Sequence, residues 1–294
     1  MLLQAYHSNL NNFIHYTPMP IVTLMTDFGN KDYAVAAVKG AILSTVEQPQ
    51  IVDISHEIAP YNPTEAAYVL KNAYKTFPKG SIHIIGVESE KTPENQHLAM
   101  YFDGHYFIGA DNGIFAMIKG DLKSDKMVSI NIHDKMPTSF PVLEAFVWVA
   151  AHISRKGTLE VVGKPVEYIK EIKELRPVIN PQGDQILGAV IYVDNYGNVI
   201  TNITRKIFNE VGKSRAFTIF ARNVKFRKVF ETYSDAIDFS IPKEKRDEDG
   251  KKIALFNDAD HLELAIYKSN TQTVGGAQSL FGLEYRESIT VKFE

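Results

Sequence analysis

The sequence predicts an α/β protein, with an N-terminal α/β domain built on a largely parallel sheet and a smaller, mostly-β C-terminal domain. In the first part of the chain, short apolar runs alternate three times with helical patterns, which is typical of parallel strands joined by right-handed crossovers. In the last part, short strand-like runs follow one another. The length of 294 residues is too great for one ordinary domain and comfortable for two.

The first predicted strand is Ile21–Thr26, an apolar, β-rich run that ends at the turn residues 27–30. A helix is predicted over Tyr33–Val46, with Asp32 available to cap it. The alternation continues with three further elements: a strand over Ile51–Ile54, a helix over Thr64–Tyr74 with Thr64 as its cap, and a strand over Ser81–Val87.

The middle of this domain is predicted to add strands, in part as a hairpin. The three short apolar runs that predict them are Ala99–Phe102, Tyr106–Ile108 and Ile114–Ile118. The strongly apolar segment Val142–Ser154 predicts a helix, which holds the only tryptophan, Trp148.

A change in composition predicts the boundary between the domains. Residues 174–184 are polar and hold two Pro and one Gly, as expected of a linker. We therefore expect a leader over residues 1–20, disordered or docked on a neighbour, an N-terminal domain over 21–178 and a C-terminal domain over 184–294. The strands expected in the second domain are Ile186–Val193, Val199–Ile203, Ala216–Ala221, Ile253–Phe256, Leu262–Tyr267 and Ile289–Phe293.

Composition excludes several classes of function. Lys and Arg total 32 against 35 Asp and Glu, and this net charge of −3 offers no excess of positive charge for binding nucleic acid. The absence of Cys excludes disulfides, zinc–thiolate sites, iron–sulfur clusters and cysteine nucleophiles. No apolar stretch is long enough to predict a membrane span, and the first twenty residues lack the pattern of a secretory signal. The expected location is cytoplasmic.

Polar clusters follow several predicted strands. In a parallel α/β sheet, ligands bind beyond the carboxyl ends of the strands. Each cluster alone is typical of turn chemistry, because Asp and Asn cap backbone groups in tight turns. Together they suit a small molecule that carries several hydroxyl groups or a positive charge. The clusters are Asp27, Asp53 with His56, Glu88 with Glu90, residues 111–113 and residues 194–198.

Two other kinds of enzyme are disfavoured by their missing motifs. A dinuclear metallophosphoesterase requires Asp-x-His, whereas this chain has Asp53-x-x-His56 and lacks the other two elements of that pattern. The Gly-x-Ser-x-Gly motif of serine hydrolases and the Gly-x-Gly-x-x-Gly motif of dinucleotide-binding proteins are both absent. A metal-dependent hydrolase nevertheless remains an alternative.

Four segments occur in a specific order along the chain: Asp-Phe-Gly at 27–29, Val-Asp-Ile-Ser-His-Glu-Ile-Ala-Pro at 52–60, Gly-Ala-Asp-Asn-Gly at 109–113 and Tyr-Gly-Asn-Val-Ile-Thr-Asn-Ile at 196–203. Together they resemble the S-adenosyl-L-methionine (SAM) hydroxide adenosyltransferase family, the SAM hydrolases, which is related to SAM-dependent fluorinating and chlorinating enzymes. The resemblance covers about residues 21–294.

This resemblance implies an α/β domain followed by a smaller β domain, as the elements predict. It implies a homotrimer in which the ligand lies between one subunit's N-terminal domain and its neighbour's C-terminal domain. The implied reaction is attack of water or hydroxide at the ribose C5′ of SAM, which gives adenosine and L-methionine. No metal or other cofactor is expected, because the sulfonium is already a good leaving group.

In the N-terminal domain, the resemblance implies three residues that bind substrate. Asp27 would bind the ribose hydroxyls, and Asp32 would contact the methionine portion. Tyr61 matches an aromatic position that lines the pocket.

In the C-terminal domain, the resemblance implies four more. Asp194 matches the carboxylate that holds the methionine ammonium, whereas Tyr196 and Asn198 match residues at the adenine. Asp258 stands where the family has a Ser at the methionine end. An insertion after Lys268 keeps the later adenine contacts from being transferred.

The chain departs from the Asp–Arg–His set that the family uses to position water. Glu88 replaces the Asp, Asn95 falls at the Arg position and Pro141 replaces the His. Asn has no positive charge and Pro has no side-chain donor, so neither takes over the lost role. Glu88 is the candidate catalytic residue, because its carboxylate can hold or deprotonate water. Glu88 and Glu90 would repel halide, which disfavours halogenation.

Three hypotheses follow. The leading one is hydrolysis of SAM. The second is a module that binds SAM or adenosine with little or no turnover, because two of the three family groups are lost. The third is the metal-dependent hydrolase. For the segment 88–97, a charged surface loop and an altered catalytic loop both remain open.

Overall fold

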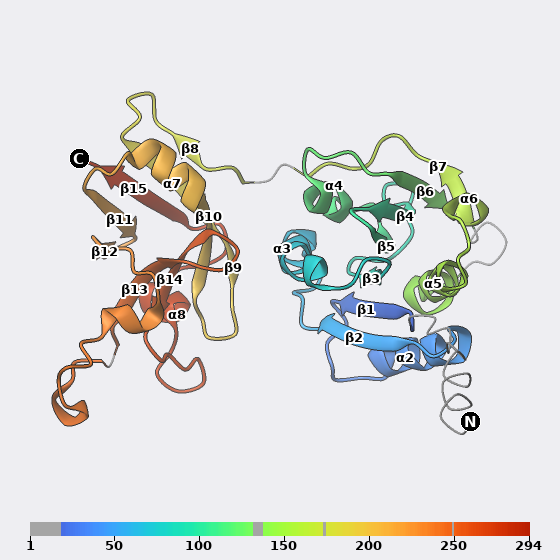
Figure 1. The fold of residues 1–294 in the computed structure, drawn as a ribbon, viewed down its shortest axis with the longest axis horizontal. Coiled ribbons are helices and arrows are strands. Elements are labelled where there is room, and N and C mark those ends of the chain that lie inside the picture. The colour runs from blue at the N-terminus through green and yellow to red at the C-terminus, as the bar shows by residue number, and fades with distance from the viewer. Residues whose placement is uncertain (1–18, 132–137, 173–174, 249) are drawn as a thin grey trace, which may run out of the picture. The chain divides into compact units, whose positions relative to one another are not determined.

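The computed structural model describes residues 19–131, 138–172, 175–248 and 250–294, so nearly all of the predicted leader lies outside the described residues. The chain divides into two compact units, one ending at Ile172 and one reaching Glu294 (Figure 1). The predicted fold class is confirmed: the first unit is α/β and the second is built on antiparallel strands.

A seven-stranded sheet forms the centre of the first unit, in the order β2-β1-β3-β5-β4-β6-β7. The neighbours β2, β1, β3 and β5 are parallel, whereas β4, β6 and β7 pair antiparallel. The predicted hairpin is β4 with β5. The strands are β1 (Ile21–Thr26), β2 (Gln50–Ser55), β3 (Ile82–Gly86), β4 (His97–Phe102), β5 (His105–Ala110), β6 (Lys126–Ile130) and β7 (Gly163–Pro165).

Helices cover both faces of this sheet, as the alternating pattern predicts (Figure 1). One face carries α2 (Ala34–Thr45), a π-helical turn (Val142–Phe146) that continues into α5 (Val147–Ser154), and α6 (Leu159–Val162). The other face carries α3 (Pro63–Ala73), a 3₁₀ turn (Tyr74–Thr76) and α4 (Ile114–Lys119).

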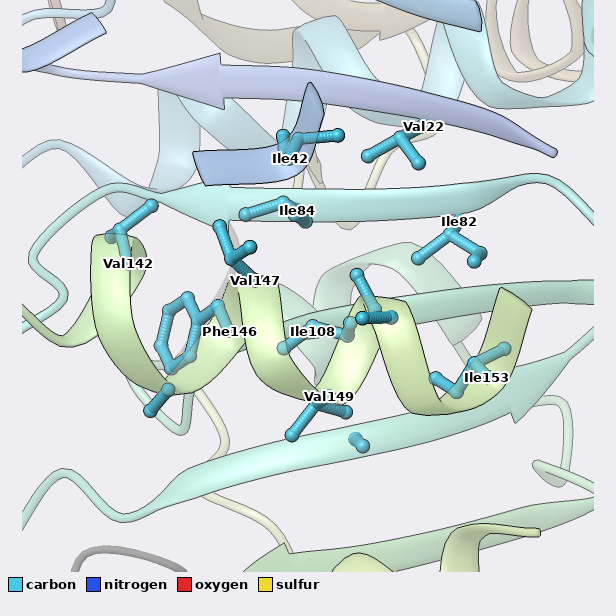
Figure 2. Close-up of a cluster of buried hydrophobic side chains, with 14 of the residues drawn as sticks. Val22, Ile42, Ile82, Ile84, Ile108, Val142, Phe146, Val147, Val149 and Ile153 are labelled. Carbon is cyan, nitrogen blue, oxygen red and sulfur yellow. The ribbon is translucent and has the colours of Figure 1, made fainter. Parts of the chain in front are cut away.

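The side chains of alternate residues on β3 enter different cores. Ile82 and Ile84 pack with Phe146 and Val149 on the α5 face (Figure 2), whereas Ile85 packs on the α3 face. This alternation follows from the period of two along a strand, which places successive side chains on opposite faces of the sheet.

Two sequence predictions are wrong in detail. Residues 114–118 form helix α4 and not a strand, because Gly113 turns the chain with φ 98° and the apolar run after it packs one helical face on the sheet. Helix α3 is capped by Asn62 and not by Thr64, since the Asn62 side chain accepts from the Glu65 N–H and Pro63 occupies the first turn.

The second unit has eight strands in the order β12-β11-β15-β9-β10-β14-β13, with β8 paired to β9. The paired strands all run antiparallel. They are β8 (Val178–Ile179), β9 (Gln185–Val193), β10 (Val199–Thr204), β11 (Phe217–Ala221), β12 (Val224–Phe226), β13 (Lys252–Phe256), β14 (His261–Ile266) and β15 (Ser288–Phe293). The helical segments are α7 (Arg205–Gly212), α8 (Ala277–Phe281) and two 3₁₀ turns, Tyr233–Ala236 and Lys243–Lys245.

Candidate functional site

In the first unit, the candidate residues meet at the carboxyl ends of three neighbouring parallel strands. Asp27 follows β1, Glu88 follows β3 and Asp111 follows β5. Because parallel strands end at the same edge of a sheet, loops far apart in sequence converge here.

The Asp27 carboxylate organises this edge. Its Oδ2 accepts the backbone N–H of Tyr61 at 3.1 Å and of Glu88 at 3.2 Å. Both donors have left-handed backbones, with φ 58° at Tyr61 and 44° at Glu88, so the carboxylate stabilises two unfavourable turns. Among the described residues, no hydrogen bond to Oδ1 is made, and this oxygen is available to a ligand.

The segment 88–97 is held in place by polar contacts. Asn95 is buried, and its Nδ2 donates to Glu88 Oε1 at 3.3 Å. The buried His97 ring lies 2.8 Å from the Ser89 carbonyl through Nε2. The backbones of Thr92 and Asn95 bond each other in both directions. The Glu88 carboxylate therefore has a fixed position at the strand end.

Lys170 enters the same cluster from the segment after β7. Its Nζ donates to Asn95 Oδ1 at 2.9 Å, and its backbone N–H donates to both carboxylate oxygens of Asp111 at 3.0 and 3.1 Å. Burial raises the pKa of Asp111, and the Lys170 N–H and charge oppose this effect. Sequence analysis missed Lys170, because nothing near it in the chain marks the contact.

Pro141 lies next to this edge of the sheet. Phe140 packs edge-on against Phe28 with ring centroids 5.6 Å apart. A Cβ on Gly86, at the end of β3, would meet Val142 Cγ2 at 3.1 Å. The structure thus brings residues 140–142 to the ends of β1 and β3, where the proline side chain offers no donor.

Asp32 lies on the loop after β1, and Tyr61 lies on the loop after the neighbouring strand β2. Asp32 Oδ1 accepts the N–H of Ala34, the first residue of α2, at 2.9 Å. The N-cap position itself is held by Tyr33, which makes no side-chain cap, so the predicted cap at Asp32 stands one residue before it. Tyr61 is 77% exposed, so most of its surface is open to a ligand or solvent.

Beside Asp27, a polar chain runs from Thr26 to Lys39. His56 Nδ1 lies 2.8 Å from Thr26 Oγ1, and His56 Nε2 lies 3.0 Å from Asp53 Oδ1. Lys39 Nζ donates to Asp53 Oδ2 at 2.6 Å. Desolvation opposes ionisation of Asp53, but the contacts with Lys39 and His56 outweigh it and lower the pKa. Within the described ranges, no three His, Asp or Glu side chains are grouped as metal ligands would be.

In the second unit, the turn after β9 presents the predicted residues together. Asp194 Oδ1 accepts the N–H of Tyr196 at 2.9 Å and of Asn198 at 2.8 Å. Asp194 Oδ2 accepts Asn198 Nδ2 at 2.9 Å, which orients the amide, since a carboxylate only accepts. The Asn198 Oδ1 is therefore directed away from Asp194. Gly197 has φ 75° and packs so closely on Gly276 that a Cβ would lie 2.9 Å from its Cα.

This turn borders a cavity of about 410 Å³. Tyr196 is 65% exposed, whereas Asn198 is buried. The lining residues are Asp194, Tyr196, Asn198, Tyr233, Ile266, Tyr267, Lys268 and Ser269.

Acidic groups surround Tyr233, which lines the cavity. The Tyr233 hydroxyl donates to the buried Glu263 carboxylate at 2.5 Å. Desolvation raises the pKa of Glu263, and the negative charges of Asp194 and the exposed Asp258 raise it further. Desolvation raises the pKa of Tyr233, and the hydrogen bond to Glu263 and the negative charges of Glu263, Asp194 and Asp258 raise it further. Neither Tyr233 nor Glu263 was singled out from the sequence, because the partner of each lies 30 residues away in the chain.

Comparison with known proteins gives matches in both units. The profile of the SAM hydroxide adenosyltransferase N-terminal domain matches residues 22–163, and that of the C-terminal domain matches residues 188–290. An (R)-S-adenosyl-L-methionine hydrolase of Methanocaldococcus jannaschii is 28% identical over 93% of this chain and 96% of its own length. One from Thermus thermophilus is 25% identical over 90% of this chain and 96% of its own length.

Further matches are more distant. A fluorinase of Actinopolyspora mzabensis is 22% identical over 66% of this chain and 74% of its own length. The crystal structure of a conserved protein from Thermotoga maritima, 24% identical, superposes with a TM-score of 0.77 over 92% of this chain and 99% of that one. This structural likeness supports the fold. Among the described residues, no helix is both long enough and apolar enough to span a membrane.

Proposed function

Because this chain belongs to the SAM hydroxide adenosyltransferase family, we propose that it binds S-adenosyl-L-methionine and hydrolyses it to adenosine and L-methionine. The observation that carries the proposal is the Asp27 carboxylate, which is fixed by two backbone N–H groups through one oxygen while the other oxygen stays available.

The ribose end of the substrate suits Asp27. A carboxylate accepts hydrogen bonds only, and the two ribose hydroxyls are donors that lie side by side. The contacts to Tyr61 and Glu88 set the carboxylate in place before the ligand arrives, so little conformational entropy is lost on binding. Asp32 and the exposed Tyr61 ring, on the neighbouring loops, are assigned to the methionine portion and the pocket wall.

The second unit suits the adenine and the cationic end of SAM. Asn198 Oδ1 faces away from Asp194 and can accept the adenine amine, and the exposed Tyr196 ring offers a stacking surface. Asp194 and Asp258 supply negative charge for the ammonium and the sulfonium. Tyr233 is added to this set, because it lines the cavity beside Asp194.

The proposed chemistry is one displacement. The water oxygen bonds to C5′, the C5′–S bond breaks with its electrons passing to sulfur, and methionine leaves as a neutral thioether. The water proton passes to the Glu88 carboxylate, which Asn95 holds through Oε1. Rate enhancement comes from holding the water in line and removing its solvent. No step in this sequence calls for a metal ion.

The proposal includes assembly and location. By the family resemblance, three subunits form a homotrimer whose ligand contacts the N-terminal domain of one subunit and the C-terminal domain of the next. Light scattering is expected to give three times the chain mass of 33.1 kDa. The proposed location is cytoplasmic.

The experiment is incubation of the purified protein with SAM, followed by chromatography of the products. Equal amounts of adenosine and methionine are expected, and EDTA is expected to leave the rate unchanged. An EDTA-sensitive reaction would instead support the metal-dependent alternative.

The second candidate function is binding of SAM or adenosine without turnover. It is favoured by Asn95 and Pro141, which by the family resemblance stand at the positions of an Arg and a His. Calorimetry that detects binding, together with chromatography that detects no product, would establish it. An Asp–Arg–His set introduced at positions 88, 95 and 141 should then start turnover.

A further inference from the structure

We propose that Lys170 is a positioning residue for the attacking water, acting on Glu88 through the side-chain amide of Asn95. This inference rests on the proposed hydrolysis of SAM. Lys170 brings a positive charge to the Asn95–Glu88 pair from a distant segment of the chain.

The three side chains form one hydrogen-bonded line. Lys170 Nζ lies 2.9 Å from Asn95 Oδ1, and Asn95 Nδ2 lies 3.3 Å from Glu88 Oε1. An ammonium only donates and a carboxylate only accepts. The chemistry therefore permits a single orientation of the Asn95 amide between them.

The segment that carries Lys170 is anchored on both sides. Its backbone N–H is held by both oxygens of Asp111, at the end of β5. The flanking residues Ile169 and Ile172 pack on the α3 face of the core, and Ile172 lies against Gly113 so closely that a Cβ there would collide with it. The lysine backbone is thus fixed relative to β3 and β5, although its side chain reaches from an exposed position.

The charge of Lys170 affects the orientation of the Glu88 carboxylate. The ammonium polarises the Asn95 amide, which strengthens its donation to Glu88 Oε1. With Oε1 held, the carboxylate cannot rotate freely, and Oε2 is presented in one direction. A water on Oε2 would then have a defined position, as in-line attack requires.

A purely structural role is the rival explanation, in which Lys170 only ties the segment 88–97 to the sheet. Kinetics distinguishes the two. In Lys170→Met, kcat is expected to fall about 10-fold to 100-fold, the loss that one charge-assisted hydrogen bond represents, with KM changed less than about 3-fold. Lys164→Met, an exposed lysine on β7, is the matched control and is expected to keep the wild-type kcat.

Two rescue variants sharpen the test. Lys170→Arg retains the charge and a donor to Asn95, and most of the activity is expected to remain. Asn95→Arg combined with Lys170→Met moves the cation to position 95 and is expected to recover at least part of the lost kcat. A Lys170→Met enzyme with wild-type kcat, or one that loses activity only through unfolding, would overturn the inference.

A spectroscopic readout separates this inference from the proposed function. The side-chain NH₂ resonances of Asn95 are expected to shift in Lys170→Met and in Glu88→Gln, and to stay in place in Lys164→Met. If they shift as expected while the wild type releases no adenosine, the hydrolase proposal fails but the Lys170–Asn95–Glu88 line stands. If Lys170→Met leaves them unchanged, the line is refuted whatever the activity.

Discussion

Replacement of Asp27 by Asn tests the ribose-binding carboxylate most informatively. In the wild type, Oδ2 accepts two backbone N–H groups at 3.1 and 3.2 Å, and Oδ1 remains for the ligand. In Asp27→Asn the side chain is a neutral amide, and its nitrogen donates a hydrogen bond where a carboxylate oxygen accepted one. Each remaining hydrogen bond is then weaker by about 1 kcal/mol, because a charged acceptor contributes more than a neutral one.

The magnitude follows from the bonds affected. Loss of charge and of one acceptor toward the ribose is expected to cost about 2 kcal/mol of binding, which raises the Kd for adenosine about 30-fold. Calorimetric titration with adenosine measures this without turnover. Asp121→Asn, at an exposed position after α4, is the matched control and is expected to bind as the wild type does. An Asp27→Asn protein that is folded and binds within about 2-fold of the wild type would refute the assignment.

Three further predictions test other parts of the account. Glu88→Gln is expected to lower kcat by about 10²-fold to 10⁴-fold, the range for a general base, with adenosine affinity retained; an unchanged rate would remove Glu88 from the chemistry. Desolvation and the neighbouring His105 lower the pKa of the buried His83 to about 3. The unfolded chain gains a proton at this residue below about pH 6.5, whereas the folded protein gains it only near pH 3. The contribution of His83 to the free energy of unfolding is therefore fully present above about pH 6.5 and is lost as the pH falls toward 3. The urea midpoint should therefore drop less for His83→Gln than for the wild type between about pH 7 and pH 4, and equal drops would contradict this cause. Gly113→Ala combines φ 98° with a collision at Ile172, and is expected to lower Tm more than Gly183→Ala, where φ is 67° and the space is open.

Local patterns were sufficient to predict most of the fold. The apolar run Ile21–Thr26 forms β1 at the predicted residues, and the other predicted strands, residues 114–118 excepted, begin or end within a few residues of their predicted bounds. The short strands β6, β7, β8 and β12 were not predicted. Residues 114–118 were misassigned because a short, continuous apolar run has no period that separates a buried strand from a buried helix. The cap at Asn62 was detectable, since Asn-Pro-x-Glu places a cap, a first-turn Pro and an acidic residue in register.

The candidate site was predictable only in part. Asp27, Glu88 and the turn around Asp194 follow strands, and strand ends can be located from sequence. Lys170 could not be found in this way, because its partner Asn95 is 75 residues away and the contact exists only once β3, β5 and the segment after β7 are assembled. Tyr233 and Glu263 are likewise 30 residues apart.

Attack of water at C5′ of SAM leaves the water oxygen in the product, and an isotope label detects it. The protein is incubated with SAM in water enriched in oxygen-18, and the products are analysed by mass spectrometry. Adenosine is expected to carry one oxygen-18 at its 5′-hydroxyl, together with an equal amount of unlabelled methionine. Unlabelled adenosine, or intact SAM after prolonged incubation with protein shown to bind it, would show that water does not attack C5′.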